Sequence, residues 1–322
     1  MISKVVRASL LTAALLVAGC GSSATTPPQT AIAQYVQRSH KATHAYIGAG
    51  NGGELSVYDI GSKKLSRTIS QGIDEPFDLA FDASNDLYVL NFGNDTLTVY
   101  AENAGTPKLT ISTGLNWPVA LALDNSNGLY VLNSFDNTIT VYNSKEGNER
   151  YAISDGLTYP VAIAIGADQN LYVANGANVA VYAPGAQSPT RTITTGIIDA
   201  EALAFDDAGN LFVANRKNVL MYPPGSNSPS ETIKKSSYRL GFDARGNLYV
   251  LGGTIAVFSP AGRELRDYTR GLGRTESMHV APSGDVYVGA KLQVSIYTPK
   301  IPEQPAFYIK HTPYVHAVAF GP

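Results

Sequence analysis

The chain has 322 residues, enough for one large domain or two domains of medium size. Hydrophobic residues make up 44% and charged residues only 16%, which excludes both charge-driven disorder and a long charged helical rod. The formal net charge is −2 and no basic stretch occurs, so the sequence lacks the electrostatic pattern of a protein that binds nucleic acid.

The chain begins with an export pattern that ends at its only cysteine. Lys4 and Arg7 precede a mostly apolar run at 8–19, which is too short to span a bilayer. The sequence LVAGC (16–20) resembles the bacterial lipoprotein signal, which implies cleavage before Cys20 and lipidation of its thiol. The alternative is a soluble secreted protein in which Cys20 has this place by chance. A single cysteine also leaves no internal disulfide and no cysteine-based zinc site.

We therefore predict a signal peptide at 1–19, and a lipidated cysteine with a flexible tether at 20–44. The tether prediction follows from the Ser, Thr, Pro and Gln that dominate the segment after Cys20. The resemblance implies an exported protein held in the bacterial cell envelope by its N-terminal lipid. Gly21 is not an inner-membrane retention signal of the Asp type, so we expect the outer membrane.

The rest of the chain repeats one unit about every 40 residues. LYVLNFGNDTLTVY (87–100) returns as LYVLNSFDNTITVY (129–142) and LYVANGANVAVY (171–182), with weaker copies further on. Each unit alternates apolar and polar residues, is rich in Val, Ile, Thr and Tyr, and breaks at Gly, Asn, Asp or Pro, as strands and turns do. In the second unit the pattern predicts four strands, at 78–82, 87–91, 96–101 and 108–112. Four short strands per repeat are typical of a β-propeller blade.

The two ends of the repeat region predict how the ring closes. No first strand precedes Tyr46, whereas the chain finishes on VHAVAFGP (315–322), which matches the first strand of the other units. We predict an all-β fold over 45–322: a seven-bladed β-propeller with four-stranded blades, whose C-terminal strand joins the N-terminal blade. Such closure leaves no open sheet edge. Beyond the split blade, the predicted blades are 77–112, 119–154, 161–194, 200–234, 238–269 and 277–310.

The repeat resembles those of the NHL and YVTN propeller families. The matching residues are Phe81, Asp82, Leu87, Tyr88, Val89 and Asn91, followed by the pair Val99 and Tyr100. The resemblance covers about 45–322 and implies the propeller fold. It specifies an activity only poorly, because propellers carry many unrelated functions.

Most of the recurrent polar and aromatic residues are predicted to be structural. Twelve tyrosines fall into two columns of the repeat, which we expect to pack between blades. Asn and Asp recur at strand ends, where they bond neighbouring backbone in turns; a ring of calcium-binding asparagines is the alternative. The recurrent turn residues are Asn91, Asn133, Asn175, Asn215, Asp82, Asp124, Asp206 and Asp243.

Departures from the repeat supply the candidate ligand-binding residues. In each blade, the loop before the inner strand and the loop between the second and third strands lie on the same face of the disc, which we call the top. Equivalent residues of the seven inner strands form rows around the ring. One predicted row consists of Phe77, Val119, Val161, Glu201, Tyr238, Ser277 and His316, and the next row contains Arg239. Glu201 and Arg239 form either a structural ion pair or a pair that grips a ligand. The top-face candidates are Glu201, Tyr238, Arg239, Glu276, His311, His316 and Trp117.

Trp117 and His279 each leave two interpretations open. Trp117 is either an aromatic platform for a ligand or a hydrophobe that packs against proline, since Tyr159 has the same place in the next unit. His279 is placed in the column of Leu79 and Leu121, where it is either a core histidine or a base or ligand beside Glu276 and His311.

The sequence favours binding over catalysis. It contains no P-loop, HExxH or GxSxG motif in a suitable context, so we predict no catalytic residue, metal or other cofactor. The leading hypothesis is a non-enzymatic binding or scaffold module for an envelope protein, peptide or glycan. The alternative, implied by the family resemblance, is an enzyme of the virginiamycin B lyase or gluconolactonase type, with a divalent metal at top-face His and Glu.

Overall fold

The computed structural model describes residues 31–32, 42–50, 52–272, 275–290, 293–300, 304–310 and 314–322. The predicted signal peptide, Cys20, most of the predicted tether and His311 lie outside these residues. All regular structure in the described part of the chain is β. Within the same residues there is no helix that could cross a membrane.

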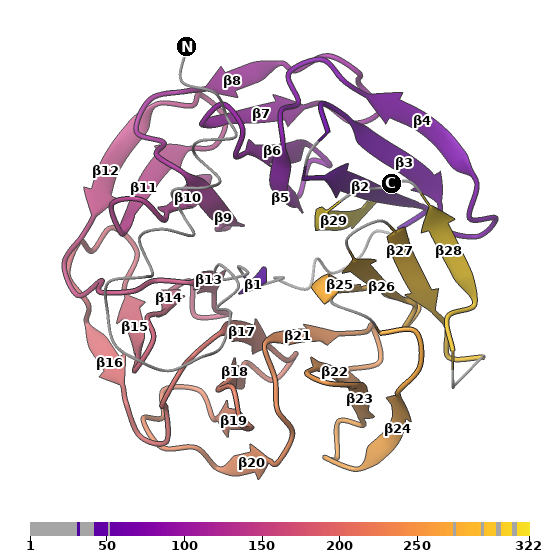
Figure 1. Ribbon diagram of the computed structural model, residues 1–322. Coiled ribbons are helices and arrows are strands. Elements are labelled where there is room, and N and C mark those ends of the chain that lie inside the picture. Colours follow the sequence, from indigo (N-terminus) through magenta and orange to yellow (C-terminus); the bar gives the residue numbers. More distant parts are fainter. Residues whose placement is uncertain are drawn as a thin grey trace, which may run out of the picture.

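The described strands form seven sheets that follow one another around a disc, and thus the predicted seven-bladed β-propeller (Figure 1). Blade 1 consists of β29 (Val315–Gly321), β2 (His44–Ala49), β3 (Leu55–Asp59) and β4 (Leu65–Ile69). Blade 2 consists of β5 (Pro76–Phe81), β6 (Leu87–Asn91), β7 (Thr96–Tyr100) and β8 (Leu109–Ile111). Blade 3 consists of β9 (Pro118–Leu123), β10 (Gly128–Asn133), β11 (Thr138–Asn143) and β12 (Glu149–Ile153).

The other four blades repeat this arrangement. Blade 4 consists of β13 (Ala162–Ile165), β14 (Leu171–Ala174), β15 (Val179–Tyr182) and β16 (Arg191–Ile193). Blade 5 consists of β17 (Ala202–Phe205), β18 (Leu211–Ala214), β19 (Val219–Tyr222) and β20 (Glu231–Ile233). Blade 6 consists of β21 (Arg239–Phe242), β22 (Leu248–Leu251), β23 (Ile255–Phe258) and β24 (Glu264–Tyr268). Blade 7 consists of β25 (Thr275–Val280), β26 (Val286–Ala290), β27 (Gln293–Tyr297) and β28 (Phe307–Lys310).

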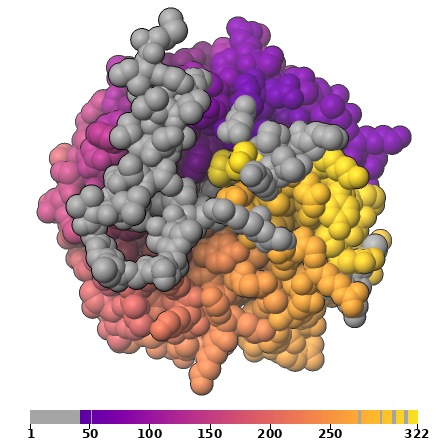
Figure 2. All heavy atoms as spheres, viewed as in Figure 1, coloured from indigo at the N-terminus to yellow at the C-terminus, as the bar shows by residue number. Residues whose placement is uncertain are grey.

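The C-terminal strand closes the ring, as predicted. β29 pairs in antiparallel fashion with β2, from His44 opposite Gly321 to Ala49 opposite Val315. Figure 1 shows this yellow strand beside the indigo one, and Figure 2 shows the blades in colour order around the disc. The first blade is therefore held by backbone hydrogen bonds between the two ends of the propeller.

Apart from the half-buried Tyr58, the residues of the two aromatic columns are buried, which confirms that they belong to the core. In the first column Tyr88 and Tyr287 are fully buried, and in the second Tyr100 and Tyr142 are. The second-column hydroxyls also donate to carbonyl oxygens of the loop that leads into the same blade, for example Tyr100 to Gln71 O at 2.6 Å. Each ring thus fills the space beside a blade while its hydroxyl holds a top loop.

The recurrent asparagines and aspartates have the predicted turn roles. Asn91 Nδ2 donates to Gly72 O at 3.0 Å, and its Oδ1 accepts from Asp74 N at 3.1 Å, so one side chain organises a whole top loop. On the bottom face, Asp124 Oδ1 accepts from the backbone N–H groups of Ser126 and Gly128 at 2.7 Å. Their hydrogen bonds explain why these residues recur without any need for a ligand.

A two-residue strand lies at the centre of the ring. β1 (Ala31–Ile32) pairs in parallel with β13, opposite Ala162 and Ile163 (Figure 1). Blade 4 therefore has five strands, and two residues of the predicted tether run along its inner edge.

Candidate functional site

The top of each inner strand is built around one irregular residue. In blades 1, 2, 3 and 7 the pairing with the second strand shifts by one residue at this point, which is a β-bulge. In blades 4 to 6 the equivalent residue donates its N–H to the second strand, as Val161 does to Ala174 O at 2.8 Å. This row consists of Phe77, Val119, Val161, Glu201, Tyr238, Glu276 and His316.

The register corrects the sequence interpretation of blade 7 by one residue. Ser277 pairs with Gly289, just as Asp78 pairs with Leu90, so Ser277 belongs to the second row and Glu276 to the first. The bulge at Glu276 adds a residue that the repeat alignment could not show.

The same one-residue correction places His279 in a different column of the repeat. It pairs with Tyr287, so its column contains Ala80, Ala122, Ala164, Ala204, Gly241 and Ala319, not the leucines. The ring is 3% exposed; Nε2 lies 3.3 Å from His316 O, and Nδ1 has no hydrogen-bond partner among the described residues. Burial lowers the pKa of His279 to about 3, so the ring is neutral at neutral pH.

Glu201 and Arg239 do not form the ion pair that the sequence suggested as one possibility. The ion pairs among the described residues include none between them. The Arg239 guanidinium is buried and donates to backbone oxygens, to Tyr238 O at 2.7 Å and to Glu276 O at 3.4 Å. Burial lowers the pKa of Arg239 to about 10 and raises the pKa of Glu201 above its ordinary value.

Four polar side chains on three inner strands bridge to the next blade. Asp78 Oδ2 accepts from Leu121 N at 2.8 Å, Ser277 Oγ donates to Val315 O at 2.8 Å, and Arg239 reaches Glu276 O. His279 makes the corresponding contact with His316 O. Each of these groups meets the backbone of the neighbouring inner strand, so the second and fourth rows of polar residues hold blades together.

A continuous row of aromatic rings crosses the top face over blades 1 to 3. His316 stacks on Phe77, with ring centroids 4.8 Å apart and planes inclined by 15°. Phe77 contacts Phe92 at 5.5 Å, Phe92 contacts Trp117 at 6.1 Å, and Trp117 contacts Phe135 at 5.3 Å. The row starts at an inner strand and ends at Phe135, which is 63% exposed. We call these five residues the aromatic row.

Trp117 is held firmly within this row. Its backbone is left-handed, with φ +51°, a conformation that costs a non-glycine residue about 1–2 kcal/mol. Trp117 N donates to Asp95 Oδ1 at 2.9 Å, and Trp117 O accepts from Ser134 N at 3.0 Å. The loops of blades 2 and 3 thus fix its backbone from both sides and present the half-buried ring at the surface.

Exposed apolar side chains extend the aromatic row along the top loops. Tyr159 on blade 4 is 51% exposed and Ile198 on blade 5 is 73% exposed. Beside Ile198, Asp199 pairs with Arg216 at 2.8 Å on the surface. The top face therefore presents an apolar arc over blades 1 to 5, with charged groups at its end.

The sequence candidates are only partly brought together. His316 and Trp117, which lie on different blades, belong to one row of rings. Tyr238 is tied to Thr275 by a 2.7 Å hydrogen bond between their hydroxyls, and Glu276 is buried. His311 lies outside the described residues.

Sequence reasoning missed three members of the aromatic row: Phe77, Phe92 and Phe135. Each departs from the repeat, since Phe77 stands where blades 3 and 4 have valine, and Phe92 and Phe135 lie in loops between second and third strands. That departure was the available signal. The contacts between loops of different blades could not be read from one unit alone.

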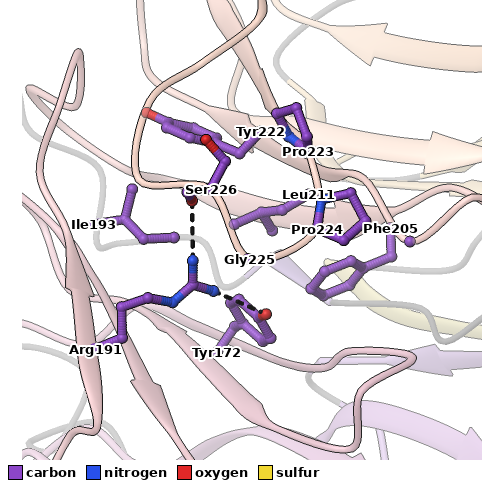
Figure 3. A pocket seen from close by; sticks show the side chains of 11 residues that line it. Tyr172, Arg191, Ile193, Phe205, Leu211, Tyr222, Pro223, Pro224, Gly225 and Ser226 are labelled. Atoms are coloured by element: carbon purple, nitrogen blue, oxygen red, sulfur yellow. Dashed lines mark hydrogen bonds between the residues drawn. The ribbon is translucent and has the colours of Figure 1, made fainter.

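A cavity on the opposite, bottom face has a structural explanation (Figure 3). It has a volume of about 10 Å³, roughly the space of one water molecule, and lies beside Arg191. Arg191 donates to Ser226 O at 3.0 Å and to Tyr172 Oη at 3.1 Å. Arg67 binds Ala104 O and Tyr46 Oη in the same way between blades 1 and 2. An arginine that repeats this contact serves as a clamp between blades.

Potential metal ligands do not converge in the described part of the chain. No group of three His, Cys, Asp or Glu side chains there has the arrangement of a metal site. His316 stacks on Phe77, and burial lowers its pKa to about 4.

Comparison with known proteins adds support for the fold. No family model and no curated protein matches the chain. A functionally unknown protein from Desulfotomaculum acetoxidans DSM 771 has a similar crystal structure, with a TM-score of 0.75 and 13% identity over 87% of this chain and 99% of that one. Kuenenia stuttgartiensis hydrazine synthase is similar with a TM-score of 0.59 and 17% identity, over 70% and 77%. These likenesses show the β-propeller fold alone.

Proposed function

We propose that the protein is a non-enzymatic binding module of the bacterial cell envelope, and that its top face takes an apolar segment of a protein or peptide. The aromatic row is the observation that carries this proposal. Its members come from three blades, contact one another in sequence, and run from the half-buried His316 ring to Phe135, which is 63% exposed. Aromatic anchors of this kind dominate the energy of protein interfaces.

The surroundings favour a peptide over a glycan. Phe77, Phe92 and Phe135 offer ring surface without any hydrogen-bonding group, and Tyr159 and Ile198 continue the surface with exposed apolar atoms. A glycan needs polar groups placed around each ring, whereas an extended peptide can set aromatic or aliphatic side chains against successive blades.

We place the protein in the envelope on the sequence alone. The proposal includes export, lipidation of Cys20 and attachment to the outer membrane, together with a repeat of the NHL or YVTN type. A Cys20→Ser variant should leave the membrane fraction or accumulate with its signal uncleaved. A variant that still carries lipid and sediments fully with membranes would contradict the lipoprotein assignment.

The binding proposal is tested with a library of short random peptides displayed on phage and panned on the immobilised protein. We expect enriched peptides with spaced aromatic or aliphatic residues. Their affinity should fall by roughly 30-fold or more for Trp117→Ala with Phe135→Ala, because loss of a central anchor costs about 2 kcal/mol or more. Leu265→Ala, an exposed apolar residue on the outer strand of blade 6, is the matched control and should bind normally.

Two results would overturn the proposal. One is a set of enriched peptides that bind the double variant as well as the parent. The other is a stoichiometric divalent metal in the purified protein with turnover of an ester or glycosidic probe, which would favour the propeller-enzyme alternative. If the protein bound to a glycan array and no peptides were enriched, the proposed site would remain but its ligand would be a glycan.

A further inference from the structure

The outer edge of the disc is divided into two chemically different parts. Four exposed apolar side chains lie at the starts of the outer strands of three successive blades. Leu265 on β24 is 39% exposed, Phe307 and Tyr308 on β28 are 46% and 49% exposed, and Leu65 on β4 is 53% exposed. Figure 1 shows β24, β28 and β4 following one another along one side of the disc.

The other blades have polar residues at the positions equivalent to Tyr308, Leu65 and Leu265. By their pairing with the third strand, Thr110, Thr192 and Thr232 of blades 2, 4 and 5 correspond to Tyr308. In blade 3, Glu149 corresponds to Leu65 and Arg150 to Leu265. Since all seven outer strands derive from one repeat, the apolar residues on blades 6, 7 and 1 are a local departure. The outer strands of blades 2 to 5 show that the fold does not need apolar residues at these exposed positions.

Unpaired basic residues are also concentrated on blades 6, 7 and 1. Four basic residues in bottom loops or next to the outer strands of blades 6, 7 and 1 are exposed and have no ion pair among the described residues: Lys64, Arg245, Arg263 and Lys300. Two acids nearby are paired, Asp285 with Lys63 at 2.8 Å and Glu264 with Lys235 at 2.9 Å, and Asp59 accepts a hydrogen bond from Ser62 N.

The bottom of blades 2, 3 and 5 is acidic by contrast. Glu102, Glu146, Glu149 and Glu231 are exposed there. Lys108 and Lys145 of blades 2 and 3 are engaged, Lys108 with Asp86 and Lys145 with Asp82, and Arg150 is an exposed base beside Glu149. A large anionic surface is therefore attracted to one side of the disc and repelled from the other.

We propose that the bottom rim of blades 6, 7 and 1 docks on an anionic membrane surface. Aromatic and leucine side chains sit at the level of lipid headgroups, and exposed lysine and arginine bind anionic lipids; both kinds occur together on this rim. The proposed top-face function is independent of this contact. With the bottom rim on the lipid, the aromatic row on the opposite face stays accessible to a partner.

The test uses the full chain with Cys20→Ser, so that no lipid on the cysteine contributes. A new cysteine at Ser66, the second residue of β4, carries a dye that responds to apolar surroundings. Thr192→Cys, the second residue of β16 on the opposite side of the disc, is the matched control; both positions are exposed. Vesicles contain either phosphatidylcholine alone or phosphatidylcholine with phosphatidylglycerol.

We expect a blue shift of the dye at 66 with the anionic vesicles only, and little change at 192. Binding through residues before the propeller would not favour one position over the other. Phe307→Ser with Tyr308→Ser, and separately Lys64→Glu with Lys300→Glu, should each weaken the response at 66 by roughly tenfold in lipid concentration. Tyr159→Ser with Ile198→Ser, which removes as much exposed apolar surface from the top face, should leave it unchanged.

Four outcomes would overturn the proposal. The first is an equal response at 66 and 192, and the second is no response at 66 with anionic vesicles. The third is a shift at 66 that depends on protein concentration without lipid, which would assign the rim to contact with a second copy of the chain. If the folded variants keep their melting temperature yet the response is unaffected, the rim residues do not form the docking surface.

Discussion

Blades 3 and 4 and blades 6 and 7 fill the same four inner-strand positions in different ways. Blades 3 and 4 have Val-Ala-Leu-Ala (119–122) and Val-Ala-Ile-Ala (161–164), all buried. Blades 6 and 7 have Tyr-Arg-Leu-Gly (238–241) and Glu-Ser-Met-His (276–279), with the same pairing to the second strand. The large apolar residue at the third position is the one common element, so that position and the backbone ladder define the blade.

The difference lies in how each blade meets the next one. In blades 3 and 4 small alanines let the inner strands pack closely against apolar residues of the neighbouring blade. In blades 6 and 7 longer polar side chains reach the backbone of the next inner strand. The junctions on this side of the ring depend on hydrogen bonds from side chains to backbone, which makes them more sensitive to substitution and to pH than the alanine junctions.

Removal of β29 should have the largest effect, because it opens the ring on the polar side. A chain ending at residue 314 loses the partner of β2 and the burial of Val315 and Val318. Each buried valine contributes on the order of 1.5–3 kcal/mol, against a total stability of roughly 5–15 kcal/mol. We expect loss of cooperative thermal unfolding by circular dichroism and aggregation. A truncated chain that melts within a few degrees of the parent would contradict closure by β29.

Gly289→Ala should come next, since it tests how tightly blade 7 meets blade 1. A Cβ at this position would clash with Val315 O and with Ser277 Oγ, so the strands would have to separate. We expect a loss of about 1–3 kcal/mol in the free energy of unfolding, measured by urea titration. Gly253→Ala is the control, because nothing lies within 4 Å of its added Cβ. Equal stability of the two variants would mean that the junction is loose.

The fold could be predicted from the sequence almost completely, whereas the site could not. The repeat alone located all seven blades and, for blade 2, placed strands within two residues of β5 to β8. It failed at the bulge of Glu276, because an inserted residue leaves no mark in the spacing when the unit length already varies. It also could not pair Phe92 with Trp117, which belong to loops of different units. Contacts between blades depend on the ring, not on the repeat.

His279→Ala should change the pH dependence of stability more than stability itself. Burial lowers the pKa of His279 from 6.5 to about 3, so the stability that the neutral ring supports is present above pH 6.5 and is lost as the pH falls toward 3. The alanine variant should therefore lose about 2 kcal/mol less than the parent between pH 6.5 and 5. Urea titrations at the two pH values measure this difference.

Two other titratable groups determine how that result is interpreted. Burial raises the pKa of Asp78 to about 7, so its contribution has the opposite sign: it is lost as the pH rises through 7 and partly offsets the histidines. His316 remains in the variant, and its lowered pKa preserves some acid sensitivity. Met278→Ala, a change of similar size on the same strand, should lower stability equally at both pH values. An unchanged slope for His279→Ala would mean that the ring is not neutral and buried.

The smallest effect is expected for two substitutions that distinguish the contribution of the Trp117 ring from that of its backbone conformation. Both Trp117→Ala and Trp117→Gly remove the ring contacts with Phe92 and Phe135. Glycine adopts the left-handed φ of +51° without the steric cost that alanine has, so the glycine variant should be the more stable of the two by about 1 kcal/mol or less. At an ordinary position glycine would instead be the less stable one. Differential scanning calorimetry of the two variants decides the sign. Both variants should lose affinity for the enriched peptides to the same extent, because the ring makes the contact and the backbone only positions it. If the alanine and glycine variants differed in peptide affinity, the binding role would belong to the loop and not to the ring.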